Sequence, residues 1–339
     1  MSLTETPGAD LCPVCLGRAN RPVYSEARDP ITLNSFLVVE CITCGIVFTT
    51  PRPTSMDSYY PQRYRAYGPL VTGLLQRFYL MRIARWARFK PNRGRVLEVG
   101  CGPGLMLAGF RKRGWTVLGI ERNEAVAEAA RRALGLEILT TTVEELSAEL
   151  RFDLIIMFQV LEHIGEPVPL LQECARRLAP GGHLVTNVPN FSSWQSRFAG
   201  SNWLHLDVPR HLVHFTPRTL QETLERGGLK LVEMSFTSPE HDPYGWVESA
   251  ISRLTGRANT LTRFLMGLDP FGPAVVLSFM LGAVLVVPAT LLAGASWLAG
   301  SGALMEAIAI CAAPSEKSSC DPGQMQGVAS ETPAIPHVS

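Results

Sequence analysis

A short strand followed by glycine at every second position constrains this chain more than any other feature. Residues 96–104 read VLEVGCGPG, and a stretch of helical composition, LMLAGFRKRG, follows at once. Only glycine allows so sharp a turn together with a close approach of the backbone to a ligand. The helix that follows would direct its free N–H groups and its positive dipole end at that ligand. The segment therefore predicts a ligand-binding strand–turn–helix unit.

A carboxylate beyond this turn indicates what kind of ligand is bound. The second strand, WTVLGI (115–120), stops at Glu121, which lies 17 residues after Gly104. A carboxylate at this point can accept hydrogen bonds from two ribose hydroxyls. Position 105, where a dinucleotide fold has its third glycine, is leucine, and the lysine of a phosphate-binding loop is absent. The unit is therefore expected to bind a nucleoside-type cofactor that carries no pyrophosphate.

The whole string resembles motif I of class I S-adenosylmethionine-dependent methyltransferases, and the resemblance continues for about 140 residues. Segments 138–146, 152–164 and 176–190 look like the third, fourth and fifth strand regions of that family. The likeness is greatest to ubiquinone-biosynthesis O-methyltransferases, which often carry an acid where this chain has Gln159, and to bacterial methyltransferases with a zinc ribbon. The resemblance implies that S-adenosylmethionine is the cofactor and that it is bound by Glu98, Gly100, Cys101, Gly102, Gly104, Glu121, Arg122, Thr142, Val143, Gln159, Val160 and Leu161.

The pattern of the chain supports the same fold without reference to the family. Apolar runs of strand length alternate with helix-length stretches, which predicts a parallel sheet covered by helices on both faces. The fold class expected is α/β, a Rossmann-like seven-stranded methyltransferase sheet with an N-terminal zinc ribbon and a C-terminal hydrophobic helical insertion. The expected units are a zinc ribbon (1–57), a basic linker helix (58–93), the cofactor-binding core (94–240), the insertion (241–302), the last core strand (303–313) and a disordered tail (314–339).

Two C-x-x-C knuckles separated by 25 residues form the second strong motif. Each knuckle presents two thiolates from one tight turn, and two knuckles complete a tetrahedral shell for Zn²⁺. The alternative is a redox pair or incidental cysteines. No signal peptide is visible, so a reducing compartment is expected for the chain's eight cysteines. We expect a structural zinc ion held by Cys12, Cys15, Cys41 and Cys44.

A basic, aromatic stretch precedes the first strand of the core. Between Ser58 and Arg95 there is no Asp or Glu, whereas nine residues are Arg or Lys. A helix is expected over 70–90. Three interpretations remain open: a linker helix that packs on the sheet with its arginines reaching outward, attraction to anionic lipid headgroups, and nucleic-acid contact. The net charge of +1 makes nucleic acid the least favoured partner.

The apolar excess of the chain is concentrated near its C-terminus, where residues 270–305 carry no charge. Pro273 and Pro288 divide this run into parts too short to span a bilayer comfortably. Segments 229–238 and 303–313 look like the last two strands of the family's sheet. If they are, the insertion between them starts and ends on the same side of any membrane. We therefore expect a re-entrant or interfacial helical hairpin with Pro288 near its bend.

This insertion sets the expected location of the protein. Three arginines ahead of it, Arg253, Arg257 and Arg263, fit a cytoplasmic face. The expectation is a cytoplasmic protein, peripheral or monotopic at the inner face of the cell membrane, with a membrane surface as partner. A buried dimerisation or substrate-lid element and a true membrane span are the alternatives. The oligomeric state is left open.

The substrate side of the chemistry needs a group that aligns a nucleophile and takes up its proton. Residues 202–216 read NWLHLDVPRHLVHFT, after the fifth strand, where such folds place acceptor loops. We expect His211 to be the base, Arg210 to pair with a substrate anion and His163 to line the methyl-transfer site. The other interpretation is that histidines of this loop only satisfy local backbone groups, as at His205 and His214.

These observations together predict methyl transfer to a hydroxyl of a lipid-linked, glycan or polyprenyl-type acceptor. The alternatives are an RNA methyltransferase, a sugar C-methyltransferase and a cofactor-binding scaffold without turnover. They differ in the nucleophile or in whether S-adenosylhomocysteine is formed at all.

Overall fold

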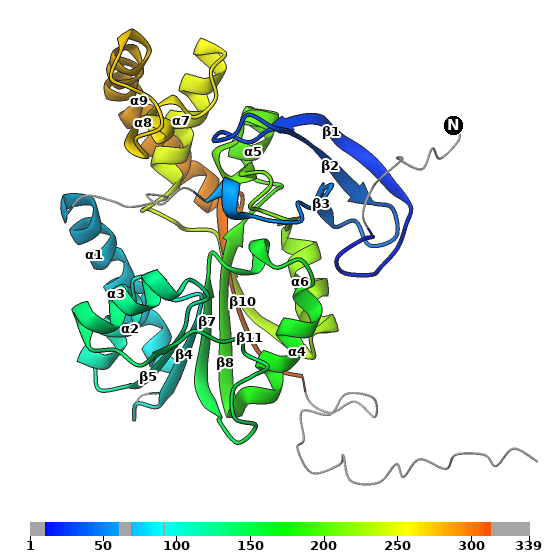
Figure 1. The fold of residues 1–339 in the computed structure, drawn as a ribbon, viewed down its shortest axis with the longest axis vertical. Coiled ribbons are helices and arrows are strands. Elements are labelled where there is room, and N and C mark those ends of the chain that lie inside the picture. Colours follow the sequence, from blue (N-terminus) through cyan, green and yellow to red (C-terminus); the bar gives the residue numbers. More distant parts are fainter. Residues whose placement is uncertain (1–10, 61–68, 91, 313–339) are drawn as a thin grey trace, which may run out of the picture.

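A seven-stranded sheet forms the centre of the computed structural model, which describes residues 11–60, 69–90 and 92–312 (Figure 1). The strand order is β10-β11-β8-β7-β4-β5-β6, and β11 alone runs antiparallel to its neighbours. The expected tail and residues 61–68 of the basic stretch lie outside the described residues. The strands are β4 (Arg95–Val99), β5 (Thr116–Ile120), β6 (Ile138–Leu139), β7 (Phe152–Phe158), β8 (Leu178–Pro189), β10 (Leu229–Ser235) and β11 (Leu304–Cys311).

Helices cover both faces of this sheet, as the sequence predicts. Successive side chains of a strand point to opposite faces, so Val96 and Leu97 enter different cores, and so do Leu154 and Ile155. Both faces are buried, which explains why the strands are apolar runs rather than alternating patterns. One core contains residues of α1 (Pro69–Trp86), α2 (Leu105–Lys112) and α3 (Glu124–Leu134), and the other contains residues of α4 (Pro167–Arg177) and α6 (Pro217–Arg226).

The cysteine-containing N-terminal segment is joined to the core through a second sheet. Strands β1 (Asn20–Arg28), β2 (Ser35–Cys41) and β3 (Val47–Thr50) form an antiparallel ribbon. Its fourth strand, β9 (Val213–His214), comes from the loop region after the large sheet's β8. The ribbon is therefore not an independent appendage, because its edge is completed by a distant part of the chain.

Two arginines of α1, Arg82 and Arg85, are paired with acids of the fold, whereas Arg77 is exposed. Arg82 is 8% exposed and forms ion pairs with Glu240 at 2.6 Å and with Glu306 at 2.5 Å. Arg85 pairs with Glu306 at 3.1 Å and also with Glu233. Of the three interpretations of this stretch, the packed linker helix agrees with the structure, but these arginines bind carboxylates instead of reaching outward. Their charge is neutralised within the fold.

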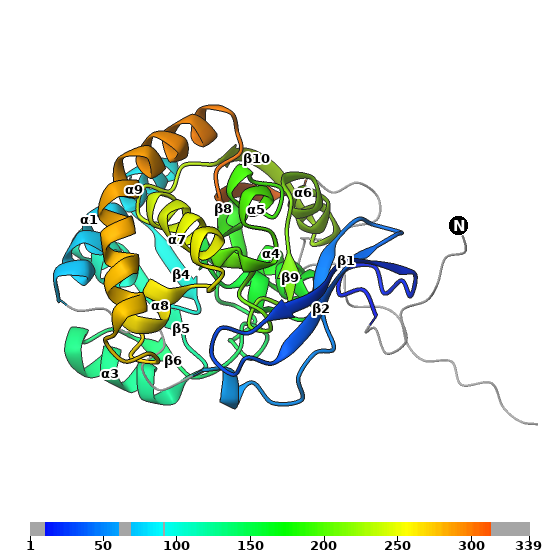
Figure 2. The ribbon, with the colours of Figure 1, turned by 90° about the horizontal axis from the view of Figure 1, so that it is seen from above.

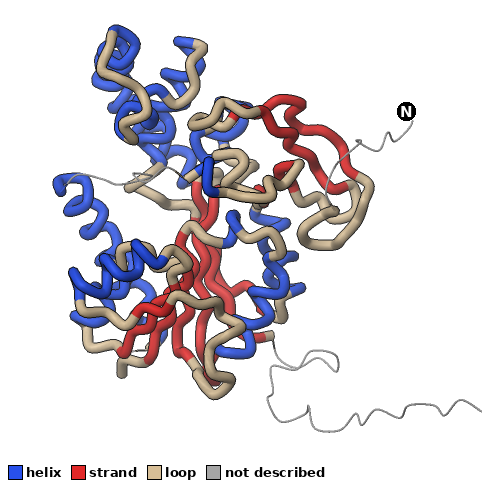
Figure 3. Tube along the Cα trace, viewed as in Figure 1, coloured by secondary structure: helices blue, strands red, loops and turns tan. Residues whose placement is uncertain are grey.

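The insertion between β10 and β11 is helical and stands beyond one end of the sheet (Figures 2 and 3). It consists of α7 (Asp242–Thr255), α8 (Thr260–Leu265) and α9 (Pro273–Leu298), and the short α5 (Trp194–Ala199) contacts α7. The expected bend at Pro288 is wrong, because α9 is one helix that continues through this proline. Residues Ala289 and Ala293 pack against Trp246 and Ile251, and this packing holds the helix together past the missing backbone donor.

Candidate functional site

The glycine turn after β4 has the backbone conformation that its sequence predicts. Gly100 (φ +68°) and Gly102 (φ +51°) are in the left-handed region, which other residues rarely adopt. A Cβ atom on Gly100 would lie 2.6 Å from Cγ2 of Val160, at the end of β7. A Cβ atom on Gly102 would meet nothing within 4 Å among the described residues. The absence of a side chain at Gly100 thus allows the ends of β4 and β7 to pack closely. Gly102 instead borders open space, where a ligand can approach the backbone.

Two carboxylates flank this turn. Glu121 follows β5, and its Oε2 accepts a hydrogen bond from the Gly102 N–H at 3.0 Å while its Oε1 accepts one from the Asn123 N–H at 2.9 Å. Glu98 lies in β4, and its pKa is raised to about 8, mainly by burial and to a smaller extent by the charge of Glu121. A hydrogen bond from the backbone of Leu107 lowers it only in part. At neutral pH Glu98 is therefore largely protonated, and Glu121 is the half-exposed acid at the turn.

Gln159 closes the same site from β7. Its backbone is left-handed (φ +57°), its N–H donates to the Asn187 carbonyl at 2.9 Å, and its Nε2 donates to Oδ1 of Asn187 at 2.8 Å. The side chain is thus held in one orientation by β8. A non-glycine residue in this conformation is uncommon and often marks a functional position.

The four expected zinc ligands meet at one point of the ribbon. The Sγ atoms of Cys12 and Cys44 lie 3.5 Å apart, as do those of Cys15 and Cys41, and all four lie within 4.8 Å of one another. Thiolates bound to Zn²⁺ at ~2.3 Å in a tetrahedron would lie ~3.8 Å apart. A Cβ atom on Gly17 would lie 3.3 Å from Sγ of Cys15, so the turn leaves little space beside the cluster. The donor set and its spacing fit a structural zinc ion.

The loop after β8 holds a buried polar network instead of the expected base. His211 is completely buried, its Nδ1 lies 2.8 Å from the His205 carbonyl, and its Nε2 lies 3.8 Å from Oδ2 of Asp207. The side chain of Arg210 is also fully buried, between Asp29 at 2.8 Å and Asp207 at 2.6 Å. These contacts support neither expected role. A buried ring cannot reach an acceptor, and Arg210 is already paired with two carboxylates.

The neighbouring histidines have separate environments. Nδ1 of His163 lies 2.8 Å from the Arg210 carbonyl, and its ring meets that of His211 edge-on at 4.7 Å. Glu162, His163 and His211 also place possible ligand atoms within 4.8 Å of one another. Nε2 of His214 lies 2.9 Å from Oγ1 of Thr49, and burial lowers the pKa of His214 to about 3. His214 is therefore neutral, and its partner is a side-chain hydroxyl of the ribbon, not the local backbone group that the alternative interpretation expected.

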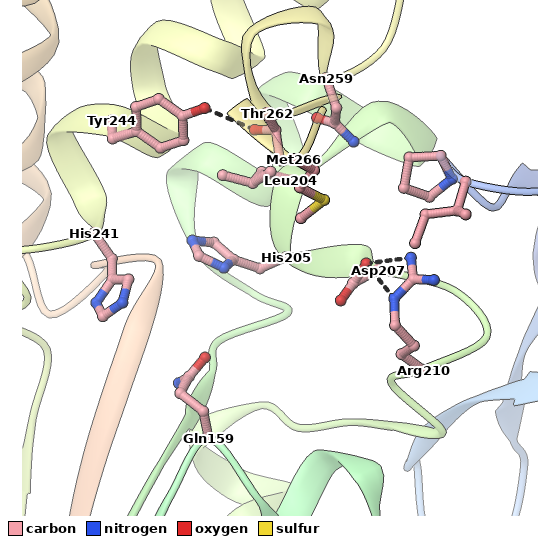
Figure 4. Close-up of a pocket in the computed structure, with 12 residues that line it drawn as sticks. Gln159, Leu204, His205, Asp207, Arg210, His241, Tyr244, Asn259, Thr262 and Met266 are labelled. Carbon is pink, nitrogen blue, oxygen red and sulfur yellow. Dashed lines mark hydrogen bonds and ion pairs between the residues drawn. The ribbon is translucent and has the colours of Figure 1, made fainter. Parts of the chain in front are cut away.

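A pocket lies beside Gln159, under the helical insertion (Figure 4). It contains about 670 Å³ of space between protein atoms, a volume that includes open solvent. Four parts of the chain build it: the ribbon, the segment just after β7, the loop after β8 and the insertion. The lining residues are Pro30, Ile31, Gln159, Leu204, His205, Asp207, Arg210, His241, Tyr244, Asn259, Thr262 and Met266.

Comparison with known proteins identifies the central domain. Residues 72–234 match a family described as "Methyltransferase domain". A ubiquinone biosynthesis O-methyltransferase of Alkalilimnicola ehrlichii is 38% identical over 125 residues, which cover 34% of this chain and 51% of that protein. Its counterpart in Nitrobacter winogradskyi is 31% identical over 163 residues, 44% of this chain and 61% of that protein. This chain contains a class I S-adenosylmethionine-dependent methyltransferase domain.

The matches to the methyltransferases do not extend over whole proteins, since this chain spans between half and three fifths of the length of these two relatives. Among solved structures, a methyltransferase from Archaeoglobus fulgidus is 18% identical, with a TM-score of 0.45 over 69% of this chain and 93% of that chain. The ribbon and the insertion lie outside or mostly outside the matched range.

Within the methyltransferase domain, the structure brings most of the motif residues to the carboxyl ends of β4, β5 and β7. The exceptions concern side chains. Val143 and Leu161 are buried in the core and can offer only their backbone to a ligand, and burial raises the pKa of Cys101, which keeps its thiol neutral. Thr142 is half-buried, with its N–H donating to Glu145 at 3.1 Å, and Arg122 is exposed.

The pocket-lining residues of the insertion were not predicted from the sequence. His241, Tyr244, Asn259, Thr262 and Met266 are distant in sequence from every methyltransferase motif, and only the fold brings them over Gln159. The doublet Glu240-His241 just after β10 is the one local feature that could have indicated a polar site there.

Proposed function

We propose that this chain transfers the methyl group of S-adenosylmethionine to a hydroxyl of a small-molecule acceptor. The observation that supports it most is the glycine turn with Glu121, inside a domain of the methyltransferase family. The bound cofactor supplies an activated methyl group on a sulfonium. The protein's task is then to align an acceptor oxygen with that carbon and to receive the hydroxyl proton.

The residues at the strand ends have distinct roles in this proposal. Glu121 receives the ribose hydroxyls, because its carboxylate already lies against the turn and is half-exposed. Gly102 lets the backbone approach the amino-acid part of the cofactor. The backbone at Thr142 and Val143 borders the adenine. Gln159, held by Asn187, faces the methyl-transfer side, since it also lines the pocket.

The zinc ion has a structural role in this proposal. All four of its ligands come from the protein, so no coordination position is left for a substrate. Zinc would fix the ribbon, and the ribbon in turn supports the loop after β8, because Oγ1 of Thr49 donates to the His211 carbonyl at 2.8 Å and β3 pairs with β9. Metal binding would thereby stabilise one wall of the pocket.

We further propose that α9 attaches the protein to a lipid surface. Among the described residues, α9 is the one helix that is long and apolar enough to cross a membrane. It has 26 residues, and its most apolar stretch has a mean hydropathy of 2.5 and is 17% buried. Its large apolar side chains line one face at helical spacing, and several are more than 60% exposed: Met280, Val284, Val287, Leu291 and Leu298. The opposite face, with Val275, Ala289 and Ala293, is buried.

The topology favours an interfacial position over a crossing. β10 and β11 are paired neighbours in one sheet, so the insertion leaves and re-enters the domain on the same side. Two further exposed apolar residues, Leu254 and Phe271, and two exposed arginines, Arg253 and Arg257, lie on the same insertion. This combination suits the headgroup region of an anionic leaflet. It supports a cytoplasmic protein held at the inner face of the membrane.

The acceptor proposed is lipid-linked, a glycan or of polyprenyl type. The relatives' names refer to ubiquinone biosynthesis, and an acceptor with an apolar part would be concentrated at the surface that α9 contacts. Two arginines of the basic stretch that could have contacted RNA, Arg82 and Arg85, are instead neutralised by acids of the fold.

Calorimetry and label transfer test this function. The purified, zinc-loaded chain should bind S-adenosylmethionine and S-adenosylhomocysteine, and it should transfer labelled methyl groups into one fraction of cell material separated into lipid, glycan, RNA and protein. Heat of binding with a nicotinamide dinucleotide but with neither sulfur nucleoside would overturn the cofactor assignment. Cofactor binding without label in any fraction would overturn the transferase function.

A further inference from the structure

The pocket under the insertion contains one buried amide whose oxygen has no partner in the described part of the chain. Asn259 is 7% exposed, and its Oδ1 accepts no hydrogen bond from the described residues. It occupies the N-cap of α8, where an asparagine side chain usually caps its own helix, but it makes no such bond. The amide is turned into the pocket instead (Figure 4). A buried oxygen of this kind requires a donor, which a ligand hydroxyl can supply.

The remaining lining combines apolar side chains (Pro30, Ile31, Leu204 and Met266) with polar ones and offers no net charge. Its acid and its guanidinium, Asp207 and Arg210, are bound to each other, with Nε and Nη2 of Arg210 at 3.0 and 2.6 Å from Oδ1 of Asp207. The Tyr244 hydroxyl and Oγ1 of Thr262 lie 2.7 Å apart on the wall formed by the insertion. Such a lining favours a neutral group with several hydroxyls over a phosphate or a carboxylate, because it would leave an added charge unpaired.

Two imidazoles line the pocket near Gln159. The ring centroids of His205 and His241 lie 6.4 Å apart, and the His241 ring also lies 6.4 Å from that of Phe158, the last residue of β7. The side chain of His241 is 25% exposed, whereas the whole residue His205 is only 5% exposed. His241 is therefore the imidazole that an entering acceptor reaches first.

The surroundings of His241 suit a proton acceptor. Nδ1 of His241 lies 3.2 Å from Oγ of Ser238 and 3.8 Å from Oε1 of the buried Glu240. A carboxylate behind one ring nitrogen orients the imidazole and stabilises its charged form. The other charged or titratable groups near it are Arg82, which is paired with Glu240, and the buried Asp242.

We propose that this pocket is the acceptor site, that it takes an uncharged group bearing several hydroxyls, and that His241 takes up the proton. The proposal rests on the methyl-transfer function proposed above. In the reaction the acceptor oxygen forms a bond to the methyl carbon while the carbon–sulfur bond breaks. That electron pair stays on sulfur, giving S-adenosylhomocysteine, and the hydroxyl proton moves to the imidazole of His241. Asn259 positions the acceptor through a second hydroxyl and touches no reacting atom.

Two variants test the site, with initial rates of label transfer from S-adenosylmethionine into a total lipid extract of the producing cells. Asn259→Gly keeps the left-handed backbone (φ +56°) and removes the amide, so the rate at limiting extract should fall roughly 10-fold or more. His241→Gln should lower the rate roughly 100-fold. It should also abolish the increase in rate with rising pH that is expected when His241 loses its proton. His183→Gln, at a ring stacked on Phe89, is the matched control and should leave the rate unchanged.

Binding measurements separate the possible outcomes. The affinity of both variants for S-adenosylmethionine should stay within a factor of two of wild type. Rates within twofold of wild type in both variants, with wild type active, would overturn the acceptor site. Labelled product retained by an anion exchanger, or found in RNA or protein, would overturn the neutral acceptor class. Wild type that binds cofactor and labels nothing would overturn the transferase function itself, and this inference with it.

Discussion

Asp29 of the cysteine ribbon and Arg210 of the methyltransferase domain form an ion pair in which both side chains are completely buried. Oδ1 of Asp29 lies 2.8 Å from Nη2 of Arg210. The same guanidinium pairs with Asp207 and donates to the Tyr59 carbonyl at 2.9 Å. One arginine thus connects the ribbon, the linker and the loop that lines the pocket.

Loss of this pair should destabilise the fold more than loss of a surface pair. Asp29→Ala leaves a buried guanidinium with Asp207 alone, and we expect the free energy of unfolding to fall by about 3 kcal/mol. The control is Glu26→Ala in the same ribbon, which removes an exposed pair with Arg28 and should change it by less than about 1 kcal/mol. Urea unfolding of both variants measures the difference. An equal loss in the free energy of unfolding in both variants would show that the buried pair stabilises the fold no more than the exposed pair does.

The cysteine cluster should hold one zinc ion per chain and stabilise the pocket wall. Cys44→Ala should lose the metal, measured by mass spectrometry of the element, and lower the thermal midpoint. Label transfer should fall more than cofactor affinity, because the ribbon supports the acceptor side. The matched control, Cys174→Ala, removes a buried thiol outside the cluster and should retain full zinc content. A Cys44 variant that keeps zinc would contradict the four-thiolate site.

Glu121 should contribute to cofactor binding beyond its effect on the turn. Glu121→Ala removes a carboxylate acceptor, and a charge-assisted hydrogen bond of this kind is worth roughly 1.5–3 kcal/mol, so Kd for S-adenosylmethionine should rise roughly 10- to 100-fold. Glu137→Ala, at an exposed acid outside the turn, should leave Kd unchanged. Calorimetry with both variants decides it, and equal Kd values would remove Glu121 from the site.

The buried Glu98 should make the stability of the cofactor-free protein fall as the pH rises. Its pKa is about 8 in the fold, against an ordinary value of 4.5, so the folded state holds a proton that the unfolded state releases. The stabilisation is complete below pH 4.5 and is lost as the pH rises toward 8, a difference on the order of 4 kcal/mol. Glu98→Gln should flatten urea midpoints measured between pH 5 and pH 8. If the urea midpoint of the variant falls as steeply with rising pH as that of wild type, a group other than Glu98 causes the pH dependence.

The parts that the sequence predicted are those whose physical cause is local. A glycine turn needs positive φ at Gly100 and Gly102, and a strand buried on both faces must be apolar throughout, so β4, β5 and β7 could be located from residue types alone. The loop after β8 shows the limit. A buried ionic network and a catalytic site use the same residues, and only tertiary contact with Asp29 shows that Arg210 belongs to the former.

The insertion shows a second limit of the same kind. Val275 is 3% exposed and Val284 is 74% exposed in the same helix, yet the residue type is identical. Periodicity cannot separate the two faces of α9 when both are apolar, so the sequence predicts an apolar element without saying what covers it. The pocket was missed for a related reason, since Asn259 and Gln159 line the same pocket only because of the tertiary fold.

The exposed face of α9 gives the last prediction. A variant with Val284→Ser, Val287→Ser and Leu291→Ser should bind vesicles of phosphatidylethanolamine and phosphatidylglycerol roughly 100-fold more weakly than wild type, because each lost side chain is worth about 1 kcal/mol of apolar burial. Cosedimentation measures this. The matched control carries Leu16→Ser, Leu33→Ser and Val232→Ser, which are also exposed but lie outside the insertion, and it should bind like wild type.

The exposed face of α9 could be covered by a lipid surface or by a second copy of the chain, and the oligomeric state of the protein in solution distinguishes the two. A monomer that binds vesicles through α9 agrees with the membrane proposal. A dimer that ignores vesicles and dissociates in the α9 variant would overturn it, because the apolar face would then be covered by protein. Residual binding that depends on anionic lipid in the α9 variant should disappear when Arg253 and Arg257 are also replaced, since both are exposed on the same insertion.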